Sequence, residues 1–100
     1  MWGMIAKITI LPGKRDEMIR ILEESAPDMQ GCLSYVVAND TADENTIWVT
    51  EVRDSSHDAS LSLPVVKNAI PRAKAVVSNF KRIAVTRPVW GAGLPSTHAH

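Results

Sequence analysis

The sequence predicts a small α+β domain whose strands and helices follow one another in the order βαββαβ. Three observations predict it. Stretches of β-branched residues that alternate with a period of two are interleaved with stretches of helical spacing. Pro, Gly, Asp and Asn residues separate these stretches, as they do at turns. The chain has 100 residues, of which 45% are hydrophobic, so we expect a single domain over residues 1–100, with its core at about residues 4–89 and an irregular tail at 90–100.

The first half of the chain predicts two strands joined by a helix. Residues 4–11 are rich in β-branched side chains, and Pro12 and Gly13 end this strand. Residues 14–26 place apolar side chains on one side of a helix and charged side chains on the other. Residues 31–39 alternate again and form the second strand.

The second half predicts a hairpin, a helix and a last strand. Residues 40–45 (DTADEN) have the composition of a turn, so residues 46–53 pair with the strand before them. Helical sequence runs over residues 55–77 and is interrupted by two prolines, the first of which, Pro64, suits the first turn of a helix. Residues 80–89 form the last strand.

This order of elements is that of the ferredoxin-like fold, with a four-stranded antiparallel sheet. Neither face of the predicted sheet is consistently polar, and two helices on a sheet can cover only one face. The second apolar face therefore predicts a sheet-to-sheet homodimer with twofold symmetry.

Composition excludes several classes of function. Lys plus Arg and Asp plus Glu both number 11, so there is no basic excess to bind nucleic acid. No apolar run approaches the roughly 20 residues of a membrane span, and residues 1–11 lack the features of a signal peptide. The single cysteine, Cys32, excludes a disulfide framework and a Cys-based zinc site within one chain. We therefore expect a cytoplasmic protein that binds neither nucleic acid nor membrane.

No standard catalytic motif is present in the sequence, neither a phosphate-binding loop nor a nucleophile elbow. The candidates are instead polar and aromatic residues on elements that could face an internal cavity. They are Tyr35, Asn39, Trp48, Glu51, His57 and Arg72. Four of them also have a purely structural interpretation: Tyr35 as a sheet aromatic, Asn39 as a strand-end residue, Trp48 as a core or interface side chain, and Arg72 as a solvated helix residue.

Glu51 and His57 are the candidates for proton transfer. Glu51 lies in a strand with Ile47, Val49 and Val52, where burying a carboxylate costs several kcal/mol unless it is paired or protonated. It either meets a cation, such as Arg53, Arg72 or Arg82, or acts on a substrate. His57 lies at a predicted helix N-terminus, where the helix dipole favours the neutral imidazole that accepts a proton. Its alternative is a solvent-facing residue of the first helical turn.

The hairpin carries a recognisable pattern. The strand Gly31-Cys32-Leu33-Ser34-Tyr35 has the form GC-x-x-Y, and residues 43–45 and 47–52 follow as a turn and a strand that contains Glu51. Residues 56–61 and the stretch from Pro64 to Lys67 make up the second helical region, and residues 5–13 are the opening strand with its Pro-Gly turn. In this order and spacing, these segments resemble the antibiotic biosynthesis monooxygenase family over about residues 4–86.

The resemblance implies a dimeric α/β barrel of two ferredoxin-like subunits. It also implies a cofactor-independent monooxygenase, with neither metal nor flavin, that oxidises a small quinol or polycyclic phenol with molecular oxygen. The deprotonated substrate supplies electrons to oxygen, while the protein supplies a dry cavity, a proton acceptor and hydrogen bonds. The catalytic candidates are His57 and Glu51, and the substrate-binding candidates are Tyr35, Asn39, Trp48, Arg53 and Arg72.

Arg53 stands where the family's E-x-W pattern has a tryptophan that lines the cavity. This departure favours an alternative function, a non-catalytic ligand-binding or stress-related dimer of the same fold. A haem-degrading branch of the same fold uses an asparagine, a tryptophan and a haem-ligating histidine. In this chain the corresponding positions hold Ala6, Ser60 and Ile70, so the haem interpretation lacks its ligand.

Overall fold

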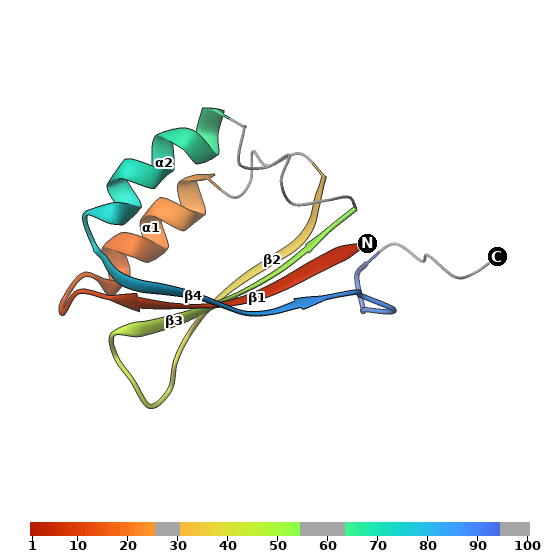
Figure 1. Ribbon diagram of the computed structural model, residues 1–100, viewed down its shortest axis with the longest axis horizontal. Helices are drawn as coiled ribbons and strands as arrows, with labels where there is room; N and C mark the ends of the chain where they lie inside the picture. Colours follow the sequence, from red (N-terminus) through yellow and green to blue (C-terminus); the bar gives the residue numbers. More distant parts are fainter. Residues whose placement is uncertain (26–30, 55–63, 95–100) are drawn as a thin grey trace.

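The computed structural model describes residues 1–25, 31–54 and 64–94 (Figure 1). Its elements follow in the order β1 (Trp2–Ile10), α1 (Arg15–Ser25), β2 (Cys32–Asn39), β3 (Thr46–Arg53), α2 (Pro64–Lys74) and β4 (Val77–Thr86). The strands form one antiparallel sheet in the order β2-β3-β1-β4, and both helices lie on the same side of it. The predicted ferredoxin-like fold is confirmed.

Most element boundaries lie within two residues of the prediction, but β4 (Val77–Thr86) begins and ends three residues earlier than the predicted 80–89. β3 covers the predicted residues, and α2 begins at Pro64 as predicted. However, α2 ends at Lys74 and β4 begins at Val77, both earlier than predicted. The cause is pairing with the end of β1, since the amide of Leu11 donates to the carbonyl of Val76 (2.8 Å) and Val77 pairs with β1. The predicted helix start at residues 55–63 lies outside the described residues.

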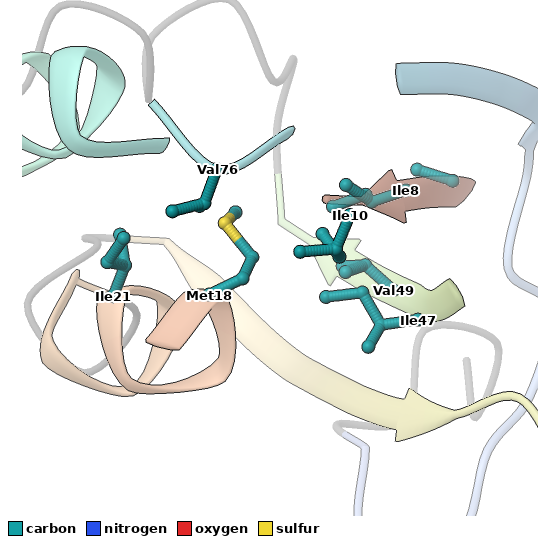
Figure 2. Close-up of a cluster of buried hydrophobic side chains, with 8 residues drawn as sticks. Ile8, Ile10, Met18, Ile21, Ile47, Val49 and Val76 are labelled. Atoms are coloured by element: carbon teal, nitrogen blue, oxygen red, sulfur yellow. The ribbon is translucent and has the colours of Figure 1, made fainter. Parts of the chain in front are cut away.

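The core lies between the helices and the sheet (Figure 2). Alternate residues of β1 and β3 point toward the helices, as their period of two predicts, and α1 turns one apolar side toward them. Within the described part of the chain, neither helix is long and apolar enough to cross a membrane. The buried apolar residues are Ala6, Ile8, Ile10, Met18, Ile21, Ile47, Val49 and Val76.

Irregular register decides which side chains of β2 face the helices. β2 shifts register against β3 between Cys32 and Ser34, so Cys32 lies opposite Arg53 and shares a face with Tyr35. Strict alternation along β2 would place Cys32 and Tyr35 on opposite faces. The extra residue at the register shift reverses the direction of the side chains beyond it, so the two share a face.

β4 has similar shifts against β1. Three rows of residues consequently cross the helix-facing side of the sheet, and each row runs through the strands in the order β2, β3, β1, β4. The first row is Tyr35, Glu51, Met4 and Val85; the second is Val37, Val49, Ala6 and Arg82; the third is Asn39, Ile47, Ile8 and Phe80.

Candidate active site

A cavity of about 520 Å³ lies between the two helices and the sheet. Its size falls within the usual range of small-molecule sites. Three alanines, Ala6 on β1 and Ala69 and Ala73 on α2, leave the space open, and most of the lining is apolar. The polar side chains among the described residues that line it are Ser25, Tyr35, Glu51, Lys74 and Arg82.

Glu51 and Tyr35 lie side by side in this cavity. They are opposite each other in the pairing of β3 with β2, a position in which the Cβ atoms of two residues are roughly 5 Å apart. Glu51 is only 6% exposed, so its carboxylate is almost completely removed from water. The structure therefore brings together a buried carboxylate and a phenol on one apolar wall.

The phenol of Tyr35 is held in its protonated form. Burial raises its pKa, and the negative charge of Glu51 raises it further. At neutral pH, Tyr35 is consequently a hydrogen-bond donor to any oxygen that enters the cavity.

We expect Tyr35 to titrate well above its ordinary pKa of about 10. It is the only tyrosine, so ultraviolet absorption reports its ionisation directly. The folded protein keeps a proton that the unfolded chain releases above about pH 10, so this contribution to stability is complete below that pH and is lost as pH rises further. Tyr35→Phe should remove this part of the alkaline destabilisation in urea unfolding. A tyrosine that ionises at its ordinary pKa would contradict the buried position.

The model of the antibiotic biosynthesis monooxygenase family matches residues 1–72 of this sequence. The chain belongs to this family. A search of curated protein sequences gives no match. Family membership supports a monooxygenase-like function.

Solved structures of the family superimpose closely. A protein of Chloroflexus aurantiacus that is named for the family is 45% identical, with a TM-score of 0.85 over 94% of this chain and 98% of its own. A namesake from Deinococcus radiodurans is 22% identical, with a TM-score of 0.75 over 91% of this chain and 95% of its own. One from Nitrosomonas europaea is 9% identical, with a TM-score of 0.78 over 90% and 100%. At 22% and 9% identity, the last two structures show only that the fold is similar.

The family's GC-x-x-Y pattern has a structural reason in this chain. Gly31 has a φ of 76°, which favours glycine, and a Cβ added there would lie 2.6 Å from Oδ1 of Asp54. The amide of Asp54 donates to the carbonyl of Gly31 (3.0 Å), which fixes the start of β2 beside the end of β3. Tyr35 then points into the cavity from this anchored strand.

Three other candidates from the sequence lie away from the cavity. Trp48 is on the opposite face of the sheet, where its indole Nε1 donates to Oδ2 of Asp40 (2.8 Å). Asn39 is exposed at the end of β2. Arg72 forms a half-exposed ion pair with Glu24 (2.6 Å) that joins α2 to α1. His57 lies outside the described residues, so its role stays a prediction.

Arg53 lies on the same face as Glu51, one step further along β3, and is 2% exposed. Its Nη2 lies 3.4 Å from the position of a Cβ on Gly31, so the guanidinium reaches toward the start of β2. Arg53 is not among the described residues that line the cavity. Beside it, burial and the charge of Glu51 raise the pKa of the Cys32 thiol, which favours the protonated and unreactive form.

Three charged or aromatic residues of the cavity lining were not proposed as site residues by the sequence analysis: Lys74, Phe80 and Arg82. Arg82 was considered only as a partner for Glu51. Its place in the cavity depends on the register shift in β4, which no periodicity in the sequence reveals.

Ala6 and Ile70, two positions considered for the haem-degrading branch, do line the cavity, but neither side chain can ligate iron. Among the described residues there is also no cluster of three or more His, Cys, Asp or Glu side chains that could hold a metal ion.

Proposed function

We propose that this protein is a cofactor-independent monooxygenase that oxidises a small quinol or polycyclic phenol with molecular oxygen. The observation that carries the proposal is the pair of Glu51 and Tyr35 on the wall of an apolar cavity of about 520 Å³. A planar aromatic substrate that fills such a cavity displaces water from it, and the pair offers a proton acceptor and a hydrogen-bond donor at the same place.

In this mechanism a phenolic hydroxyl of the substrate transfers its proton to the carboxylate of Glu51, or to His57 as the second candidate base. The hydroxyl of Tyr35 donates a hydrogen bond to the resulting phenolate oxygen and stabilises its charge. The electron-rich substrate anion then reduces oxygen and forms a carbon–oxygen bond with it.

The overall reaction needs no external reductant. The substrate loses two hydrogen atoms and gains one oxygen atom, and the second oxygen atom leaves with those two hydrogens as water. A hydroquinone becomes a hydroxyquinone, and a ring methylene flanked by aromatic rings becomes a ketone.

Phe80 supports an aromatic substrate. It lines the cavity and is nevertheless 55% exposed, and Ile70, which also lines it, is 39% exposed. A planar ring system in the cavity would cover both apolar surfaces, and aromatic stacking on Phe80 contributes beyond the buried area.

The test is oxygen uptake against a panel of hydroquinones and anthrones. We expect one oxygen molecule to be consumed for each substrate molecule, with water and not hydrogen peroxide as the second product. Tight binding of the same compounds without oxygen consumption would contradict the proposal and favour the non-catalytic ligand-binding dimer instead.

A homodimer is part of this proposal, because the face of the sheet away from the helices carries apolar side chains. Val36 (53% exposed), Ile5 and Ala84 lie there in one row across the sheet. We expect light scattering to give the mass of a dimer, whose interface buries more than about 1,000 Å². Val36→Glu should shift the equilibrium toward monomer, whereas Asn68→Glu, on the exposed side of α2, should not. A parent protein that is monomeric at micromolar concentration would contradict the dimer.

We also propose a cytoplasmic location, because the chain has a single cysteine and therefore no disulfide framework of the kind that secreted small domains use. Cell fractionation with an antibody against the chain tests this assignment, and recovery in a secreted fraction would contradict it.

A further inference from the structure

The cavity carries positive charge on the side away from Glu51. Lys74 is the last residue of α2, and Arg82 lies on β4, the strand that follows. Both line the cavity and both are exposed, whereas Glu51 is almost completely buried. The cations therefore lie at the solvent side of the cavity and the carboxylate lies deep within it.

Apolar side chains of the sheet form a floor between Glu51 and Arg82. β1 lies between β3 and β4, so the backbones of Glu51 and Arg82 stand two strand spacings apart, roughly 10 Å. The side chains between them on this face are Met4, Ala6 and Val49.

The charge is local to the cavity. The chain as a whole has equal numbers of acidic and basic residues, so no general field draws anions to it. Within the described residues, no carboxylate forms an ion pair with Lys74, whereas Arg72, also in the last turn of α2, is paired with Glu24.

We propose that the cavity selects aromatic substrates that carry a carboxylate. This inference rests on the proposed function and names its substrate class. The carboxylate lies at Lys74 and Arg82, the ring system lies over the apolar floor against Phe80, and the reacting hydroxyl lies at Glu51 and Tyr35. The opposite orientation is disfavoured, because it would bring the substrate's carboxylate against the buried carboxylate of Glu51. The charges thus fix which end of the substrate reacts.

The test uses two redox-inert probes of the same shape, an anthraquinone carboxylate and the corresponding carboxamide, in isothermal titration calorimetry. We expect the parent protein to bind the carboxylate about three- to tenfold more tightly than the neutral carboxamide, the range for a partly exposed charged hydrogen bond. Lys74→Met and Arg82→Met should each reduce that preference, and the double variant should abolish it, with little change in carboxamide affinity. Higher salt should weaken carboxylate binding alone.

Matched controls separate a site from a general charge effect. Lys67→Met, on the same helix outside the described lining, and Lys81→Met, on the other face of β4, each remove one positive charge and should leave the preference unchanged.

Equal affinity of the parent protein for both probes, or equal effects of Lys67→Met and Lys74→Met, would overturn the inference and leave the proposed function standing. If neither probe binds, both this inference and the proposal that an aromatic ligand occupies the cavity would be wrong. A carboxylate preference without oxygen uptake on any quinol would support the inference and contradict only the monooxygenase reaction.

Discussion

Replacing Glu51 with glutamine is expected to lower quinol-dependent oxygen uptake by about 100-fold or more, the range of general base catalysis. The side chain of glutamine has nearly the shape of glutamate and keeps an oxygen that accepts a hydrogen bond, but it cannot accept the substrate proton. Glu51 is buried among side chains of the sheet, so a variant of equal size should preserve the packing. Steady-state oxygen uptake measures the rate, and thermal unfolding checks that the fold is intact.

The matched control is Glu23→Gln, which removes a carboxylate from the exposed side of α1 and should leave the rate unchanged. His57→Ala tests the second candidate base. A Glu51→Gln protein with full activity would remove the carboxylate from the mechanism, and a loss confined to His57→Ala would assign the proton transfer to the histidine. If neither substitution changes the rate, the cavity acts by orientation alone and the substrate loses its proton to water.

The turn of the hairpin and its second strand could be predicted to the residue because their signals are local. Oδ1 of Asp40 accepts hydrogen bonds from the amides of Ala42 (2.8 Å) and Asp43 (2.9 Å), and Asp43 in turn accepts from Asn45 (2.9 Å). Asp and Asn side chains form such bonds within a few residues of chain, so composition alone places the turn. The alternation of β3 then sets Trp48 and Glu51 on opposite faces.

The start of β4 could not be predicted in the same way, because a distant segment decides it. Val76 and Val77 continue the apolar spacing of α2, so the sequence favours a longer helix there. In the structure, hydrogen bonding to the end of β1 takes over at these residues, and Val76 becomes part of the core at 3% exposure. Tertiary pairing overrides a weak helical preference.

The residues of the candidate site show the same difference between local and distant signals. Glu51 could be singled out because a carboxylate is unusual in an apolar strand, and that signal lies within a few residues. Lys74 and Arg82 are ordinary by composition, and only the packing of α2 and the shifted register of β4 bring them to the cavity. The acidic side of the cavity was therefore accessible from the sequence, whereas the basic side was not.

Filling the cavity from α2 is expected to abolish both binding and turnover. Ala73 is a small, half-buried residue on the side of α2 that faces the sheet, and it lines the cavity together with Ala69. In Ala73→Phe the added ring has to occupy the space that we assign to the substrate. We expect affinity for a quinone ligand to fall at least tenfold, and oxygen uptake to fall with it.

The fold of Ala73→Phe should survive, because the ring enters an existing space instead of a close-packed core, and phenylalanine lowers the helix propensity by only about 0.5 kcal/mol. Asn68→Phe is the matched control, since it introduces the same ring on the exposed side of the same helix and should leave binding unchanged. The two variants therefore differ mainly in whether the ring points into the cavity. Ligand binding by Ala73→Phe at parental affinity, in a protein that unfolds at the parental temperature, would show that the ligand binds elsewhere. The pair of Glu51 and Tyr35 would then have to be explained by the structure of the sheet and not by catalysis.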